Sequence, residues 1–127
     1  MRDDLAQLTD QYLSKKGRKK RRDFERHWST ARSELEDILS AEETVRHLEY
    51  IPNGYLVLTS RRLLFTGSGD FSIPTSDIVS SGVEAAYQSS KVRVTLRSGK
   101  TMRFEFWQDK DGAIEFNEAL KPIILRK

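Results

Sequence analysis

The sequence predicts an α+β fold that is mainly antiparallel β, with helices in about the first forty residues and strands in most of the rest. Three observations predict it. Apolar residues recur at helical spacing as far as Leu39. From Glu43 onward, short strand-like segments and turn residues follow each other at intervals of roughly 8–12 residues, as in an antiparallel sandwich or barrel. A helical pattern then returns from about Asp111 to Lys121.

The N-terminal helical segment contains two apolar stripes. The first stripe is Leu5, Leu8 and Tyr12, and the second runs from Phe24 to Leu39. Because Leu13 and Phe24 are almost a whole number of helical turns apart, the stripes are in phase on one continuous helix. A break at Gly17 is the alternative, since glycine costs roughly 1 kcal/mol inside a helix. We expect the residues between the stripes to be exposed, and the first stripe to lack obvious cover within the chain.

Seven strands are predicted after this segment. They cover residues 44–51, 55–59, 62–66, 71–73, 79–87, 91–96 and 101–107. The cluster Pro52-Asn53-Gly54 forms the first turn, and Pro74 stops the fourth strand. Pro122 is expected to end or kink the final helix, which would cover an open end of the barrel.

Side-chain parity predicts the register of the last two strands. Val92 and Val94 must share a face with Met102 and Phe104, but a two-residue turn would place apolar residues opposite polar ones. A three-residue loop, residues 97–99, restores the match and requires Gly99 in the left-handed conformation. The predicted pairs are Val94 with Met102, Val92 with Phe104, Lys91 with Glu105, and Arg93 with Arg103.

Positive charge is concentrated in one segment of this 127-residue chain, whose net charge is +3. Residues 15–22, the basic run, hold seven cations: Lys15, Lys16, Arg18, Lys19, Lys20, Arg21 and Arg22. Outside the run, 15 basic residues face 19 acidic ones, a balance of −4. The run therefore predicts an anionic partner, either nucleic acid or an acidic membrane surface.

A second basic group lies on the last predicted hairpin. It comprises Lys91, Arg93, Arg97, Lys100 and Arg103. The simpler interpretation of this group is a solvated sheet face on which Glu105 is a partial partner.

Composition disfavours several classes of function. The absence of cysteine excludes disulfides and thiolate metal sites, and it fits a reducing compartment. No apolar stretch approaches the roughly 20 residues of a membrane-spanning helix, and the polar N-terminus predicts no signal peptide. His27 and His47 lack the spacing of metal ligands, and no nucleophile, base and orienting group occur together. We therefore expect no enzyme, cofactor or metal site, and a cytoplasmic protein that can lie peripheral to the inner membrane.

The stretch from Gly54 to Phe65 resembles bacterial pleckstrin-homology-like (PH-like) domains and the related GRAM domains. In those families a strand ending in Leu-Thr turns tightly into Arg-Leu-Leu-Phe, as residues 58–65 do here. Ile73-Pro74 followed by Asp77-Ile78 also matches, as does the last hairpin. The resemblance covers about residues 34–120, whereas residues 1–23 have no counterpart in those families.

This resemblance implies a strongly bent seven-stranded antiparallel barrel capped by the C-terminal helix. It implies that the Thr59 hydroxyl forms a turn and that Arg62 bonds nearby carbonyls or carboxylates. It implies no catalytic site, because members of these families bind lipids, peptides or proteins. Phosphoinositide-binding members typically gather basic residues at the first hairpin, where Pro52-Asn53-Gly54 has none, so that mode is not expected.

Three functional hypotheses follow. In the first, a non-enzymatic module binds a protein or peptide through a barrel at residues 40–127, while the N-terminal helical segment, residues 1–39, adds attraction to an anionic membrane. In the second, the basic run binds nucleic acid. In the third, the chain is a homo-oligomer in which the stripe Leu5, Leu8 and Tyr12 pairs between N-terminal helices, because uncovered apolar stripes often mark association.

Overall fold

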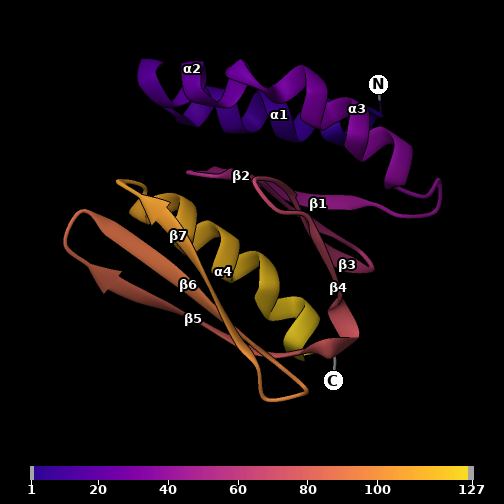
Figure 1. The fold of residues 1–127 in the computed structure, drawn as a ribbon, viewed down its shortest axis with the longest axis vertical. Coiled ribbons are helices and arrows are strands. Elements are labelled where there is room, and N and C mark those ends of the chain that lie inside the picture. The colour runs from indigo at the N-terminus through magenta and orange to yellow at the C-terminus, as the bar shows by residue number, and fades with distance from the viewer. Residues whose placement is uncertain (1, 126–127) are drawn as a thin grey trace.

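The computed structural model describes residues 2–125, which form helices, then strands, then a final helix (Figure 1). The first helices are α1 (Asp3–Lys15), α2 (Arg18–Arg26) and α3 (Trp28–Ile38). The strands are β1 (Val45–Ile51), β2 (Gly54–Thr59), β3 (Arg62–Gly67), β4 (Phe71–Pro74), β5 (Ile78–Ala86), β6 (Ser89–Leu96) and β7 (Thr101–Trp107). A short 3-10 helix, Thr75–Asp77, precedes β5, and α4 (Lys110–Leu125) follows β7. The predicted order of elements is confirmed.

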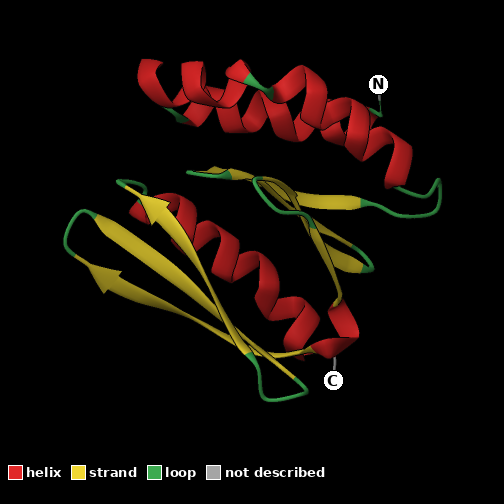
Figure 2. Ribbon diagram, in the orientation of Figure 1, coloured by secondary structure: helices red, strands yellow, loops and turns green. Residues whose placement is uncertain are grey.

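The strands form two antiparallel sheets (Figure 2). One sheet has the order β1-β2-β3-β4 and the other β5-β6-β7. The main core lies between the two sheets and α4, and it includes Leu56, Leu58, Phe104, Phe106 and Phe116. Of the two expectations for Pro122, that it ends the final helix is wrong, because α4 continues through it to Leu125.

A second core lies on the other face of the first sheet, beneath the N-terminal helices. Tyr55 and Val57 of β2 point into it, whereas Leu56 and Leu58 point into the main core. All six residues of β2 are buried for this reason. The helical layer supplies Phe24 and other apolar side chains to this second core.

The N-terminal helices form a hairpin rather than one continuous helix. Helix α1 ends before Gly17, which has extended backbone angles, and α2 and α3 run back over the sheet (Figure 1). A second break at His27 separates α2 from α3. The break at Gly17 is thus the correct alternative of the two left open by the sequence.

The apolar stripe of α1 is covered within the chain. Leu5 and Tyr12 are buried, and Leu8 is partly buried against the same second core. The expectation that this stripe lacks intramolecular cover is wrong, because the hairpin lays α1 on β1 and brings Tyr12 against Phe24, with ring centroids 4.8 Å apart.

The predicted register of the last hairpin is confirmed. Val94 pairs with Met102 and Val92 with Phe104. The backbone N–H of Leu96 donates to the carbonyl of Lys100, which closes a three-residue loop, and Gly99 has a φ of +94°.

Two glycines allow the backbones of β2 and β3 to approach each other closely at one end of the first sheet. Gly54 pairs with Gly67 across β2 and β3, and a Cβ on Gly54 would overlap the carbonyl oxygen of Thr66. We expect Gly54→Ala to lower the free energy of unfolding by about 1–3 kcal/mol, because the clash is with backbone that cannot rotate away. Urea denaturation measures the change. Gly69→Ala is the control, since a Cβ there meets open space; equal losses in the two variants would contradict the prediction.

Candidate functional site

The basic run lies at the tip of the helical hairpin. Lys15 ends α1, and α2 begins at Arg18 with Gly17 as its N-cap. The first turn of α2 contains no acidic residue, and no side chain caps its free N–H groups. Cations at a helix N-terminus oppose the helix dipole. At the tip, the cations therefore face the positive end of the α2 dipole, and no acidic side chain in the first turn of α2 offsets them.

Three cations of the run are held by the body of the protein. Lys16 Nζ lies 2.9 Å from Asp109 Oδ1, and both side chains are nearly buried. Lys20 Nζ donates to the backbone carbonyl of Trp107 at 2.8 Å, and Lys15 pairs with Glu115 at 3.3 Å. The expectation that the whole run is exposed is wrong for Lys16 and Lys20, because acceptors far along the chain reach them.

The half-buried position of Lys20 has an electrostatic consequence. Burial lowers the pKa of its ammonium group, and the nearby Lys16 acts in the same direction, while Asp109 opposes them. Asp109 also accepts a hydrogen bond from the N–H of Gly112 at 3.1 Å, in the first turn of α4. Asp109 thus joins the start of α4 to the tip of the helical hairpin.

The other four cations of the run point to solvent. They are Arg18, Lys19, Arg21 and Arg22. Within residues 2–125, none of their side chains forms an ion pair or a hydrogen bond. The 100° rotation per helical residue places Arg18, Lys19 and Arg22 on the side of α2 away from Phe24, and Arg21 at the flank of that side.

Arg26 extends this exposed face by one helical turn. Its side chain is 62% exposed and lies 3.7 Å from Asp23. We call Arg18, Lys19, Arg21, Arg22 and Arg26 the α2 basic face. Its acidic neighbour on the same side of the helix is Glu25. Sequence reasoning missed Arg26 because it lies beyond the dense run, although its spacing of four residues from Arg22 was visible.

Three of the five cations in the second basic group lie close to carboxylates, and two of them share one. Glu84 of β5 lies 2.9 Å from Arg103 and 3.7 Å from Arg93. The Arg103 hydrogen bond lowers the pKa of Glu84, and Arg93 acts in the same direction. Lys91 faces Glu105 across β6 and β7, as predicted.

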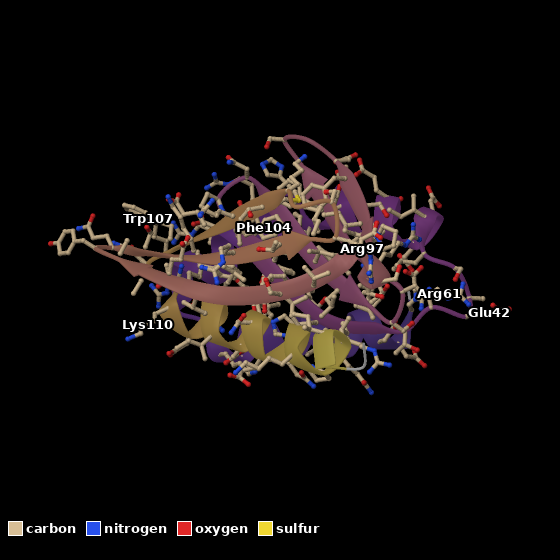
Figure 3. All side chains as sticks on the ribbon, turned by 90° about the horizontal axis from the view of Figure 1, so that it is seen from below. Glu42, Arg61, Arg97, Phe104, Trp107 and Lys110 are labelled. Atoms are coloured by element: carbon tan, nitrogen blue, oxygen red, sulfur yellow. The ribbon has the colours of Figure 1, made fainter. Side chains whose placement is uncertain are left out.

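The two remaining cations of that group, Arg97 and Lys100, lie at the β6–β7 turn. Arg97 donates to the carbonyl of Ser76 at 3.0 Å. In Figure 3, Arg97 lies toward the end of the molecule that carries Arg61 and Glu42, whereas Trp107 and Lys110 lie at the opposite end. Arg97 and Lys100 therefore lie away from the α2 basic face.

No metal centre is formed by the residues described. Across 2–125, no three His, Asp or Glu side chains gather as metal ligands. Across the same residues, no helix has both the length and the apolar character needed to cross a membrane.

Two solved structures resemble this architecture. One is the crystal structure of a pleckstrin homology domain from Shewanella amazonensis, with a TM-score of 0.60 and 21% sequence identity over 76% of this chain and 86% of that one. The other is a DUF1696 family protein with a pleckstrin-homology domain from Shewanella loihica, with a TM-score of 0.60 and 17% identity over 76% and 95% of the two chains. This chain has the PH-like fold. No protein-family model matches the sequence, and no curated protein matches it.

In this PH-like fold, the densest group of exposed cations lies on α2 and not at the turn of the first hairpin. The β1–β2 turn, Pro52-Asn53, has no basic residue. Arg26 lines a groove of about 600 Å³ together with that turn and with Glu34 of α3. One guanidinium opposite a carboxylate does not make a phosphate site, so the α2 basic face is the candidate site of this PH-like fold.

Proposed function

We propose that this chain is a non-catalytic PH-like module that docks on an anionic membrane surface through the α2 basic face. The observation that carries the proposal is the group of four cations, Arg18, Lys19, Arg21 and Arg22, exposed on one side of a helix that is fixed to the body. Each lysine or arginine close to an anionic leaflet contributes about 1 kcal/mol. Lys20 of α2 and the preceding Lys16 are bonded to the body of the protein, so the backbone that carries these cations is already positioned before binding.

A planar lipid surface suits this face better than a nucleic acid does. Lipid phosphates lie in a plane and require no groove that matches the helix. The inward side of α2 carries Phe24, which fixes the helix on the sheet, and the chain has no nucleic-acid reader motif. Self-assembly through Leu5, Leu8 and Tyr12 loses its motivation, because this stripe packs within the chain. Binding of a protein or peptide by the barrel stays a prediction.

Removing two cations from the α2 basic face should weaken membrane binding. We expect the double variant Arg21→Gln, Arg22→Gln to bind vesicles of phosphatidylcholine and phosphatidylserine about 30-fold more weakly, because two charges contribute about 2 kcal/mol near an anionic surface. Neither side chain has a partner among residues 2–125, so folding is expected to be unchanged. Vesicle flotation over a lipid titration measures the affinity.

The matched control is the double variant Arg97→Gln, Lys100→Gln. It removes the same charge from the β6–β7 turn, away from α2, and should change the affinity by less than about 2-fold, since screening is strong beyond roughly 10 Å. Equal losses in both double variants, or equal binding to vesicles of phosphatidylcholine alone, would sink the proposal. A gel shift with duplex DNA at the salt concentration at which vesicles are not bound would favour the nucleic-acid hypothesis instead.

A further inference from the structure

Two exposed aromatic side chains stand out from the rest of the molecule. The Phe, Tyr and Trp residues all lie within residues 2–125, and most are buried or half-buried. Tyr87, at the turn between β5 and β6, is 90% exposed, and Trp107, at the end of β7, is 45% exposed. Neither contributes to either core.

The segments that carry these two side chains are joined to each other. Ser89 pairs with Trp107 across β6 and β7. The N–H of Gln108 donates to the carbonyl of Gln88 at 2.9 Å, so the residue after Trp107 is bonded to the residue after Tyr87. The two aromatic residues therefore lie at the same end of the second sheet.

The same end of the sheet is joined to helix α2, which carries the α2 basic face. Lys20 of α2 donates to the backbone carbonyl of Trp107 at 2.8 Å. Figure 1 shows the β5–β6 turn, the end of β7 and the start of α2 at one end of the molecule. Figure 3 places Lys110 at the same end of the molecule as Trp107. Exposed aromatic residues and exposed cations thus occupy one end.

The β5–β6 turn can leave water at low cost. Residues 85–90 read Ala-Ala-Tyr-Gln-Ser-Ser and contain no charged side chain. Because an unpaired charge is expensive to remove from water, an uncharged turn with a tyrosine at its tip enters an interfacial region more readily than a charged loop does. Tyr and Trp are also the residues enriched at membrane–water interfaces, where the ring is apolar and the O–H or N–H stays hydrated.

We infer that Tyr87 and Trp107 insert into the interfacial region of the anionic membrane to which the α2 basic face binds. This inference rests on the proposed function, and it adds an orientation: the end that carries Tyr87, Trp107 and α2 faces the lipid. The β6–β7 turn, with Arg97 and Lys100, then faces away from the membrane.

Tryptophan fluorescence tests the insertion directly. The chain has two tryptophans, and Trp28 is buried against Phe24 and Tyr55, so Trp107 is the one that can respond to lipid. With vesicles of phosphatidylcholine and phosphatidylserine, we expect a blue shift of the emission and quenching by lipids brominated in the upper acyl chain. Both changes should vanish in Trp107→Phe, in which the Trp28 signal remains.

Vesicle affinity gives a second readout. We expect Tyr87→Ser and Trp107→Ser each to weaken binding several-fold, and the loss should persist at a salt concentration that screens the contribution of Arg21 and Arg22. The matched control is Ile38→Ser, which removes a half-exposed apolar side chain from the end of α3. That variant should bind as the unaltered chain does.

The outcomes separate this inference from the proposed function. Vesicle binding that depends on Arg21 and Arg22, with no blue shift, no quenching and no loss in Tyr87→Ser or Trp107→Ser, would overturn the inference and leave the proposed function standing. No binding of the unaltered chain to anionic vesicles would overturn both. Quenching of Trp107 by a single-stranded oligonucleotide but not by brominated lipid would assign the aromatic residues to base stacking instead.

Discussion

Replacing Phe24 with alanine is expected to lower the free energy of unfolding by about 4 kcal/mol, the upper range for a large buried side chain. Phe24 is fully buried at the centre of the second core. Its ring centroid lies 4.8 Å from that of Tyr12, 4.9 Å from that of Trp28 and 5.2 Å from that of Tyr55. Alanine would leave a cavity shared by α1, α2 and β2, and the contacts with these three rings and with that of Tyr50 would be lost.

Chemical denaturation followed by near-ultraviolet circular dichroism measures this effect. Tyr87→Ala is the control, since it removes a ring that is almost fully exposed, and it should change stability by less than about 0.5 kcal/mol. If Phe24→Ala does not fold, the smaller truncation Phe24→Leu keeps the test quantitative. A loss as small as that of the control would mean that the helical hairpin does not unfold together with the sheets.

The strand half of the fold could be predicted residue by residue because its rules are local. Side-chain parity in β6 and β7 left one loop length that placed apolar residues opposite each other, and the structure has that loop. The Thr59 turn is confirmed as well: its hydroxyl accepts the N–H groups of Arg61 and Arg62 at 3.1 and 3.0 Å. Alternation and turn chemistry act over a few residues, so one sequence is enough to read them.

The helical hairpin could not be predicted from helical phase alone. Two stripes that are in phase fit a straight helix, but they fit equally well two helices folded back on one sheet. The missing information is what lies beneath them. Tyr55 to Leu58 form a continuous apolar run, and such a run is typical of a strand that is buried on both faces. That signal implies a layer over the outer face of β2, which α1, α2 and α3 provide.

The candidate site was predicted in part. The count of charges found the basic run, and all of its members except Lys16 and Lys20 are exposed as expected. Lys16 and Lys20 escaped this reasoning, because Asp109 and the carbonyl of Trp107 lie 93 and 87 residues away in the sequence. Contacts over such separations depend on how α4 and the hairpin are placed in space. Trp107 follows the outward parity of Arg103 and Glu105, so its exposure was readable from the sequence.

Glu43→Gln is expected to lower the free energy of unfolding by about 3 kcal/mol, because it breaks a buried ion pair with bidentate geometry. The Glu43 side chain is 1% exposed. Arg62 bonds both of its carboxylate oxygens, at 2.8 and 3.0 Å, and the Thr59 hydroxyl donates to one of them at 2.6 Å. Arg62 also donates to the carbonyl of Ile38 at 2.6 Å, so the cluster ties the end of α3 to the β2–β3 turn.

The dependence of this effect on pH distinguishes the ion pair from simple packing. Burial alone would raise the pKa of Glu43, but the hydrogen bonds from Arg62 and Thr59 outweigh it and lower the pKa from 4.5 to about 2. The folded state favours the ionised form of Glu43 more than the unfolded chain does. The contribution of Glu43 to the stability of the fold is therefore complete above pH 4.5, and it is lost as the pH falls toward 2. The stability difference between the unaltered chain and Glu43→Gln should therefore shrink over that interval.

The neighbouring residue offers a matched control for this experiment. Glu42 pairs with Arg61 at 3.0 Å, but its side chain is 80% exposed, and both residues lie at the surface of one end of the molecule (Figure 3). Glu42→Gln makes the same chemical change one position earlier and should cost less than about 1 kcal/mol, because solvent screens an exposed pair. Equal stability of the two variants would contradict the prediction that the ion pair of Glu43 and Arg62 stabilises the contact between α3 and β3. The same would be true if Glu43→Gln kept the acid sensitivity of the unaltered chain.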